Sequence, residues 1–358
     1  MKKILFYLNS MKPAGGIERV VSTLANQLSE NYNIDILVKD ESISFYQLNN
    51  NISIKSIGSY EKLNMNSRLS RAFSFVKSYV VSTLKMRRYL DRNKYDYIYV
   101  TTPLNFWEVI STFKSNNNVI ASEHGARVNY NFIYKLLKKG YKFSYKYIVP
   151  TTDDAHYYSE NGYPVLYIPH LRPELNYNKS ELNNKRVLSV GRFTDDKQHL
   201  LLIDIWIDIQ KTNDKFKEWK LVLVGDGELK DEISNKIKME NIDNIEILKP
   251  QKNISDIYKN ASLFVLTSSS EGFGMVLLEA LSFGLPVISF DCPSGPRDII
   301  TNGKDGYLIS NFSNYEYKEK LKRLLTDASL REAMSIQGFE KGDTWNENNI
   351  LKRWKEIL

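Results

Sequence analysis

Short apolar stretches alternate with amphipathic ones along most of the chain. An apolar run bounded by Gly, Pro, Asn or Asp is typical of a buried parallel strand, and apolar residues every three or four positions are typical of a helix. The pattern predicts strands at residues 3–9, 34–38, 97–100, 118–122, 147–150 and 164–169, and again at 186–190, 221–224, 244–248, 262–266 and 287–290. This alternation predicts an α/β fold with parallel sheets.

The alternation is interrupted once, by a polar segment that contains Pro173. We interpret residues 171–185 as a linker between a first domain, 1–170, and a second domain, 186–344. A chain of 358 residues is long enough for two such domains. Two parallel-sheet domains would leave a cleft between them, which is a common place for a ligand.

The stretch Glu271-Gly-Phe-Gly-Met-Val-Leu-Leu-Glu279 is the most informative one. Its loop follows the predicted strand 262–266, and ligands of α/β sheets bind at the carboxyl ends of strands. Gly272 and Gly274 allow a ligand to approach the backbone, and the free amides at a helix start suit a phosphate. Glu279 has apolar neighbours and needs a partner, for which a ribose diol is one candidate. The simpler interpretation is one exposed and one helix-edge carboxylate.

Two further turns have the same setting between a strand and a helix. Gly15 and Gly16 precede the first helix, but they lack the three-glycine spacing of dinucleotide folds and are weak evidence alone. Arg192 and Lys197 follow the strand 186–190. Two cations five positions apart across such a turn can both reach one diphosphate, although ordinary surface charge is the simpler explanation.

His124 directly follows the strand 118–122 and Glu123. It is therefore placed where site residues of α/β folds lie, although a lone histidine is more often structural. The segment Gly225-Asp226-Gly227-Glu228 is typical of a turn.

Charge is unevenly distributed along the chain. The net charge is +7, and residues 1–170 hold 22 Lys and Arg against 13 Asp and Glu, so the first domain is the basic one. Two segments with interleaved aromatic and basic residues, 67–94 and 134–147, are expected to be basic helices. Such helices are usually amphipathic with a solvated face, but the one-sided charge also fits an anionic membrane surface.

Composition excludes several classes. One cysteine, Cys292, excludes an internal disulfide framework, and four histidines make a zinc cluster improbable. The apolar run at the amino terminus stops at Asn9, which fits a strand and not a signal peptide. An NAD oxidoreductase would need the glycine spacing that is absent here, and the basic residues do not form a known nucleic-acid module. We therefore expect no nucleic-acid partner.

Taken in order, these motifs resemble the retaining glycosyltransferases of family 4. The resemblance runs the length of the chain and rests on Gly15-Gly16-Ile17-Glu18-Arg19, on Gly191-Arg192 with Lys197, on Gly225-Asp226-Gly227, on Glu271 to Glu279 as the E-x7-E signature of the family, and on the turn 302–309. It implies the GT-B fold, with two Rossmann-like domains facing a cleft. It also implies that the terminal helix, 345–358, packs back on the first domain.

The resemblance also implies roles for individual residues. The implied catalytic residues are His124 near the donor sugar, Arg192 and Lys197 on the diphosphate, and Glu271 on sugar hydroxyls. Glu279 would hold the ribose, and the backbone near Lys249 would meet the base. The implied donor-binding residues are Gly15, Gly16, Arg192, Lys197, Lys249, Pro250, Glu271, Phe273, Gly274, Met275, Val276 and Glu279, with Glu123, Asp226 and Arg297 as further candidates. Arg297 stands where the usual Gly-Gly-x-Pro-Glu loop of the family is replaced by Ser294-Gly-Pro-Arg-Asp298.

The activity implied is a metal-independent transfer of a hexose or N-acetylhexosamine from a nucleotide sugar, with a UDP-sugar favoured. The acceptor would be a glycan or a lipid-linked glycan of a bacterial surface polysaccharide such as O-antigen or capsule. The nucleotide sugar is a substrate, so no cofactor is expected. The alternative is a catalytically silent, membrane-associated scaffold or nucleotide-sugar-binding subunit. The expected location is cytoplasmic, at the inner face of the cell membrane.

Overall fold

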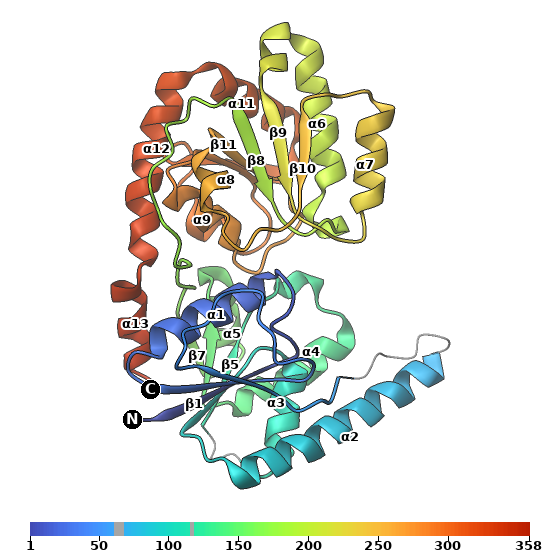
Figure 1. The fold of residues 1–358 in the computed structure, drawn as a ribbon, viewed down its shortest axis with the longest axis vertical. Coiled ribbons are helices and arrows are strands. Elements are labelled where there is room, and N and C mark those ends of the chain that lie inside the picture. Colours follow the sequence, from blue (N-terminus) through green and yellow to red (C-terminus); the bar gives the residue numbers. More distant parts are fainter. Residues whose placement is uncertain (61–67, 115–117) are drawn as a thin grey trace. The chain divides into compact units, whose positions relative to one another are not determined.

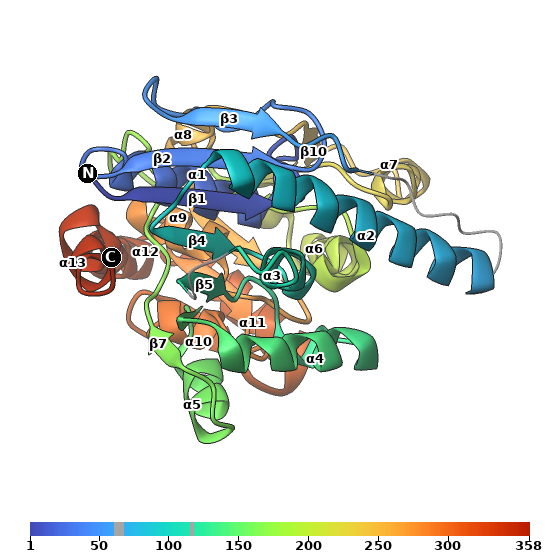
Figure 2. The ribbon, with the colours of Figure 1, turned by 90° about the horizontal axis from the view of Figure 1, so that it is seen from below.

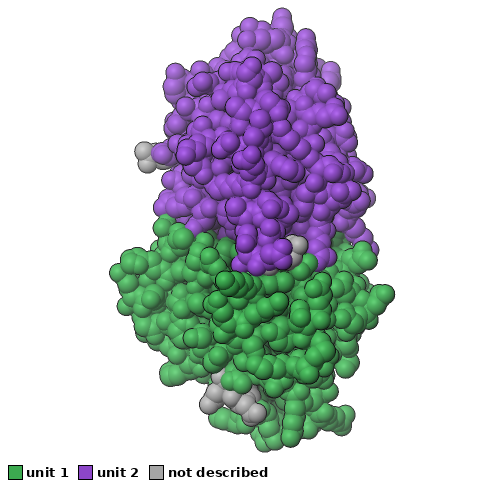
Figure 3. Space-filling view, turned by 90° about the vertical axis from the view of Figure 1, so that its left-hand side faces the viewer, with its two compact units in different colours: residues 1–171, 350–358 green, residues 172–349 purple. Residues whose placement is uncertain are grey.

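A computed structural model describes residues 1–60, 68–114 and 118–358. The chain divides into two units, which are coloured separately in Figure 3. Unit 1 comprises Met1–Leu171 with Ile350–Leu358, and unit 2 comprises Arg172–Asn349. The expected linker, 171–185, lies wholly within the described residues and has no helix or strand; all of it except Leu171 belongs to unit 2.

The described residues of unit 1 form a seven-stranded parallel sheet in the order β3-β2-β1-β4-β5-β6-β7 (Figure 1). Its central strand is almost entirely apolar, because helices cover both faces of such a sheet. The strands are β1 (Lys3–Leu8), β2 (Asn33–Val38), β3 (Ser53–Ser56), β4 (Tyr97–Val100), β5 (Val119–Ser122), β6 (Lys146–Val149) and β7 (Val165–Tyr167).

Three helices form a layer on one face of this sheet. Figure 2 shows α2 and α4 on either side of α3, and the hydroxyl of Tyr79 in α2 lies 2.6 Å from that of Ser111 at the end of α3. On the opposite face, Trp354 of α13 lies against Tyr99 of β4. The helices are α1 (Gly16–Leu28), α2 (Arg68–Arg92), α3 (Pro103–Ile110), α4 (Phe132–Lys138), α5 (Thr152–Glu160) and α13 (Glu347–Lys355), which belongs to unit 1 from Ile350 onward.

The sequence pattern predicts one basic helix over 134–147, and the structure contradicts this. The helix α4 ends at Lys138, a 3-10 turn, η2 (Lys139–Phe143), follows, and β6 begins at Lys146. Lys138 is buried, and its ion pair with Glu123 compensates the cost of burying its charge. For the other expected basic helix, 67–94, α2 occupies Arg68–Arg92, and residue 67 lies outside the described residues. Within the described part of the chain, no helix combines the length and the apolar character needed to cross a membrane.

The described residues of unit 2 form a six-stranded parallel sheet in the order β10-β9-β8-β11-β12-β13. This is the 3-2-1-4-5-6 order of a Rossmann sheet, and the first six strands of unit 1 have it as well. The prediction of two Rossmann-like parallel sheets is therefore confirmed. The strands are β8 (Arg186–Val190), β9 (Lys220–Val224), β10 (Ile245–Leu248), β11 (Leu263–Leu266), β12 (Val287–Phe290) and β13 (Gly306–Ile309).

Helices cover both faces of the unit 2 sheet as well. Trp206 of α6 and Leu321 of α11 belong to one buried cluster that covers one face, and Leu281 of α9 contacts Gly338 of α12 on the other side. The helices are α6 (His199–Thr212), α7 (Lys230–Met239), α8 (Ser255–Lys259), α9 (Met275–Ser282), α10 (Pro296–Ile299), α11 (Asn314–Thr326) and α12 (Ala328–Gly342).

Candidate active site

The carboxyl ends of β8 and β11 carry the main group of candidate residues. These two strands are neighbours in the sheet, and the chain proceeds outward from them in opposite directions. Such a point is where open α/β sheets bind ligands, because the two loops diverge and leave a crevice. Arg192 and Lys197 follow β8, and Glu271 follows β11. The topology therefore brings together residues that are about 75 positions apart in the sequence.

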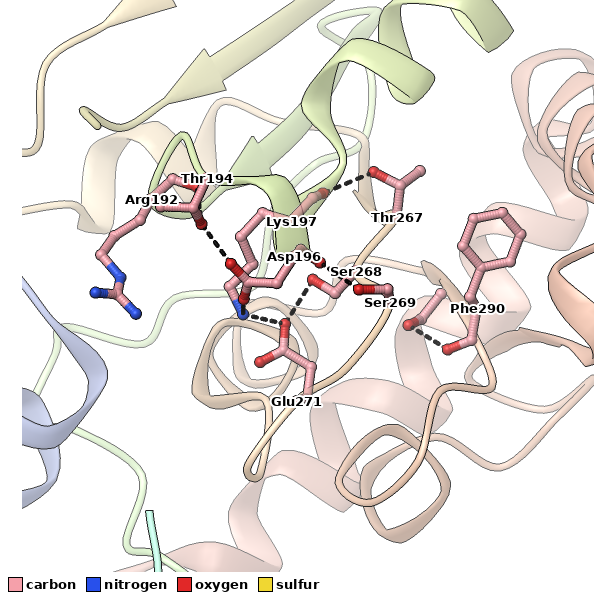
Figure 4. A network of polar contacts seen from close by, with 10 residues as sticks. Arg192, Thr194, Asp196, Lys197, Thr267, Ser268, Ser269, Glu271 and Phe290 are labelled. Atoms are coloured by element: carbon pink, nitrogen blue, oxygen red, sulfur yellow. Dashed lines mark hydrogen bonds and ion pairs between the residues drawn. The ribbon is translucent and has the colours of Figure 1, made fainter. Parts of the chain in front are cut away.

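Lys197 and Glu271 form the centre of this group. The Lys197 Nζ atom lies 2.8 Å from Glu271 Oε1 and 3.4 Å from Asp196 Oδ2 (Figure 4). Ser268 donates a hydrogen bond of 2.7 Å to the same Glu271 oxygen. The Glu271 side chain is 9% exposed and that of Lys197 is 16% exposed, so the pair is largely withdrawn from water. An ammonium group has three hydrogens, so Lys197 can bind both carboxylates and still donate to a third acceptor.

The turn around Lys197 is fixed by backbone contacts to the β11 loop. Asp196 accepts a hydrogen bond of 2.6 Å from Thr194, and its carbonyl accepts one of 2.8 Å from the Ser269 amide. Thr267 donates to the carbonyls of Lys197 and Gln198, both at 3.1 Å. These hydrogen bonds hold the loops after β8 and β11 together.

Electrostatics keep Lys197 charged. Burial alone lowers the pKa of an amine, but Glu271 and Asp196 outweigh it and raise the pKa of Lys197 above its usual value. For Asp196, burial raises the pKa, but Thr194 and Lys197 reverse this and lower it. A permanent cation next to two carboxylates is the result.

Arg192 is the exposed cation of the site. Figure 4 shows its side chain to one side of the Lys197–Glu271 contacts. Among the described residues its guanidinium has no ion-pair partner, and the side chain is exposed. Arg192 is therefore able to bind an anion without first losing an internal partner.

Two glycines allow the turn after β9 to pack closely against the turn that carries Arg192. A Cβ atom on Gly225 would lie 2.0 Å from the Gly191 carbonyl, and one on Gly227 would lie 2.5 Å from the Phe193 carbonyl. The Phe193 amide donates a hydrogen bond of 2.9 Å to the Asp226 carbonyl. The turn after β9 thus packs directly under the turn that carries Arg192. The Asp226 carboxylate is not part of the Lys197 cluster; it pairs with Lys230 at 3.4 Å.

Two glycines with positive φ shape the loops that follow β11 and β12. Gly274 has φ 93° and immediately precedes α9, and Gly295, with φ 77°, lies so close to Phe273 that a Cβ atom would be 2.3 Å from its carbonyl oxygen. This places the loop after β12 against the loop that contains Glu271. Met275 and Val276 form the first turn of α9, where amide groups are available to a ligand.

Glu279 is buried within α9. Its side chain accepts a hydrogen bond of 2.8 Å from the hydroxyl of Tyr258, which belongs to α8. The Tyr258 ring stacks on Phe283, with centroids 5.2 Å apart and planes within 6°. Tyr258 was not among the residues expected from the sequence, because its own surroundings carry no motif.

The remaining candidates of unit 2 lie at other strand ends. Lys249 and Pro250 follow β10, and Lys249 is exposed. Arg297, the expected extra cation, pairs with Asp291 at 3.1 Å. Its charge is thus partly compensated within its own loop.

Gly15, Gly16, Glu123 and His124 lie in unit 1. A Cβ atom on Gly16 would meet nothing within 4 Å, whereas one on Gly15 would collide with Glu18. The protein itself therefore leaves open space beside Gly16, which is the first residue of α1.

Glu123 points into the core of unit 1. It forms an ion pair with Lys138 and accepts hydrogen bonds of 2.5 Å from both Tyr130 and Tyr147. Burial raises its pKa, but Lys138 and the two hydroxyls lower it below the usual value. Glu123 also accepts hydrogen bonds from the main-chain N–H groups of His124 and Gly125. Its carboxylate therefore fixes the loop after β5 and does not extend toward a ligand.

Among the described residues, no group of three or more His, Cys, Asp or Glu side chains is arranged to hold a metal ion. The structure brings Lys197 and Glu271 into contact, whereas the other candidates of unit 2 lie at separate strand ends and the candidates of unit 1 lie after β1 and β5. Sequence reasoning missed Tyr258, Ser268 and His170, which contact candidate residues from segments without a recognisable motif.

Family models match nearly the whole chain. The model described as Glycosyltransferase Family 4 matches residues 14–170, and that described as Glycosyl transferases group 1 matches residues 174–341. The amylovoran biosynthesis glycosyltransferase AmsD of Erwinia amylovora is 30% identical over 374 residues, which cover 100% of both chains.

The name of a second relative includes a lipid-linked acceptor. It is the GalNAc-alpha-(1->4)-GalNAc-alpha-(1->3)-diNAcBac-PP-undecaprenol alpha-1,4-N-acetyl-D-galactosaminyltransferase of Campylobacter jejuni, 24% identical over 364 residues that cover 100% of this chain and 98% of the relative. Among solved structures, S. aureus TarM with Fondaparinux, alpha-GlcNAc-glycerol and UDP has a TM-score of 0.81, at 16% identity, over 100% of this chain and 99% of TarM. This likeness concerns the fold.

Proposed function

The chain belongs to glycosyltransferase family 4, and from this membership we propose that it is a retaining enzyme that transfers a hexose or N-acetylhexosamine from a UDP-sugar. The acceptor is a glycan or a lipid-linked glycan, and the process is the synthesis of a bacterial surface polysaccharide. Full-length similarity to AmsD and to the Campylobacter jejuni transferase supports the pathway and the acceptor class. The UDP in the TarM complex supports the choice of donor nucleotide.

The observation that carries the proposal is the cation pair at the carboxyl end of β8. A nucleoside diphosphate leaves as an anion, and fixed cations stabilise the charge that develops on it. Arg192 supplies an exposed guanidinium, and Lys197 supplies an ammonium that its carboxylate partners keep protonated. We assign the diphosphate to these two residues, and the reaction then needs no metal ion.

The carboxylates of unit 2 are assigned to hydroxyl groups. Glu271 holds the donor sugar, since only its Oε1 atom is committed to Lys197 and Ser268 in the contacts described above. Glu279 holds the ribose, and its hydrogen bond from Tyr258 orients the carboxylate for that purpose. The amides of Phe273, Gly274, Met275 and Val276 contact sugar and phosphate, and the backbone at Lys249 and Pro250 contacts the base.

The assignments in unit 1 rest on the family resemblance and on the open space beside Gly16. Gly15 and Gly16 admit the donor diphosphate to the start of α1, where the amide dipoles favour an anion. His124 binds the donor sugar.

We further propose that unit 1 binds an anionic membrane surface from the cytoplasmic side. Phe73, Val76, Val80 and Leu84 are exposed on α2, at spacings of three or four residues that place them on one face of the helix. Phe132, Ile133 and Leu136 are likewise exposed on α4. Exposed cations accompany both sets, Lys77, Arg87 and Arg88 on α2 and Lys135 and Lys139 on or beside α4. Apolar side chains flanked by cations suit the boundary between headgroups and acyl chains.

A nucleotide-sugar panel tests the function. Purified protein is heated with UDP-, GDP- and ADP-sugars, and the bound donor raises the melting temperature according to its affinity. Transfer is then measured with that donor and polyprenyl-diphosphate-linked glycans. Binding followed by transfer with retained anomeric configuration supports the proposal. Binding of a donor without transfer or hydrolysis on any acceptor favours the silent subunit instead.

A further inference from the structure

Two histidines from different strand ends lie against each other in unit 1. His124 follows β5 and His170 follows β7, and their rings are 5.5 Å apart between centroids with planes within 13°. The strand β6 lies between β5 and β7 in the sheet, so the pair spans the carboxyl end of β6. His170 is 8% exposed, and its ring is therefore held by its surroundings.

The His124 ring is oriented on its other sides as well. Its Nε2 atom lies 3.3 Å from the hydroxyl of Tyr99, and the Tyr99 ring is backed by Trp354 of α13. Glu123 accepts the main-chain N–H of His124. None of the described residues forms a hydrogen bond with Nδ1 of His124, so this is the nitrogen left for a ligand.

The charged groups around His124 cancel one another. Glu123 belongs to the same loop, and Lys138, from α4, forms an ion pair with it. Burial lowers the pKa of His124 to about 4, Glu123 opposes this, and Lys138 adds to it. Burial and the neighbouring His124 also lower the pKa of His170 well below its usual value. Two stacked imidazoles in such surroundings are both neutral near pH 7.

We propose that His170 is a positioning residue for sugar transfer: its ring fixes the plane of the His124 imidazole where that imidazole meets a hydroxyl group of the donor sugar. This inference rests on the proposed function, in which His124 binds the donor sugar. A neutral imidazole that accepts the Tyr99 proton at Nε2 carries its own proton on Nδ1 and can donate it. A tilted ring would lose this geometry.

Three variants test the proposal. His170→Ala removes the stacked ring, His170→Phe keeps a flat ring that does not titrate, and His156→Ala is the matched control because His156 is exposed on α5. Steady-state kcat and KM are measured from pH 5 to pH 8, and the imidazole protons of His124 are titrated by NMR. The NMR readout does not depend on turnover.

His170→Ala is expected to lower kcat by about 10- to 100-fold, the loss typical of a misplaced binding group. The pKa of His124 should rise toward its ordinary value of about 6.5, and the acidic limb of kcat/KM should move with it. His170→Phe should keep most of kcat, and His156→Ala should behave as the unmodified protein.

Normal kcat in His170→Ala, with an unmodified protein that transfers sugar, overturns the positioning role alone. A His124 pKa that does not change in His170→Ala also overturns it. If the unmodified protein transfers no sugar from any donor, the proposed function itself fails, and the positioning role fails with it.

Discussion

The hydroxyl of Tyr258 donates a hydrogen bond of 2.8 Å to the carboxylate of Glu279, and both side chains are buried. The two residues come from α8 and α9. The protein itself therefore orients the carboxylate of Glu279.

Replacing Tyr258 with Phe tests this orientation. Loss of the hydroxyl leaves a buried carboxylate with one donor fewer, so we expect the free energy of unfolding to fall by about 1–3 kcal/mol. We also expect weaker donor binding if Glu279 holds the ribose as proposed, because the carboxylate loses its fixed orientation. Urea unfolding and calorimetry measure the two effects, with Tyr315→Phe as the exposed control. Full donor affinity in a less stable protein would reduce Tyr258 to a structural role.

The Lys197–Glu271 pair predicts a particular dependence of stability on pH. Glu271→Gln should cost about 1.5–3 kcal/mol at pH 8, the range for a hydrogen bond to a charged group. Because the folded protein raises the pKa of Lys197, the stability from this pair is fully present below the unfolded pKa of about 10.4 and is lost as pH rises through the folded pKa. As the pH is raised from 8, the difference between the two proteins in urea should therefore shrink only above about pH 10.4. A difference that already shrinks between pH 8 and pH 9 would contradict this assignment.

Gly16→Ala is expected to weaken donor binding without lowering the stability of the fold. The new Cβ atom would meet nothing within 4 Å, so the free energy of unfolding should stay the same or rise by about 0.5–1 kcal/mol in a helical position. Donor affinity should fall at least about tenfold, because the methyl group occupies the space that a diphosphate needs at the helix start.

Gly225→Ala is the contrasting variant. Its Cβ atom would lie 2.0 Å from the Gly191 carbonyl, so stability should fall by about 1–3 kcal/mol. Thermal melts and donor titrations distinguish the two positions. Unchanged donor affinity in Gly16→Ala would remove Gly16 from the donor site.

The sequence predicts more of the fold than of the candidate site. The alternation of apolar and amphipathic stretches is strong enough to predict both parallel sheets, because a strand buried on both faces is apolar throughout. It misses β3, whose four residues Ser53–Ser56 are half-buried or exposed, and β13, which begins at Gly306 immediately after a turn.

The sequence does not predict which residues contact the candidate site residues. Glu279 is conspicuous in the sequence because its neighbours are apolar, whereas its partner Tyr258 lies 21 positions earlier. Lys138 counts as one more cation in a basic segment until the fold pairs it with Glu123. His170 meets His124 only because β5 and β7 end at the same edge of the sheet. Such contacts depend on tertiary structure and leave no periodic pattern.

The membrane proposal predicts a loss of binding when the apolar face of α2 is made polar. Replacing Phe73 and Val80 with Ser should lower binding to anionic vesicles at least tenfold, since burying one such side chain contributes about 1.5–3 kcal/mol. Flotation with vesicles that contain 0% or about 30% anionic lipid measures this, and added salt should weaken binding. Met239→Ser, an exposed apolar residue of α7, is the matched control. Equal flotation with neutral and anionic vesicles, or none, would refute the proposed surface.

In the proposed reaction, Arg192 and Lys197 stabilise a departing nucleoside diphosphate. Arg192 tests it most directly, because the described residues give its guanidinium no ion-pair partner whose loss would disturb the fold. The decisive measurement is kcat/KM for sugar transfer by Arg192→Ala, with a thermal melt as the folding control. We predict a fall of about 100-fold or more, the loss typical of one transition-state donor, with an unchanged melting temperature. Turnover close to that of the unmodified protein would contradict the claim.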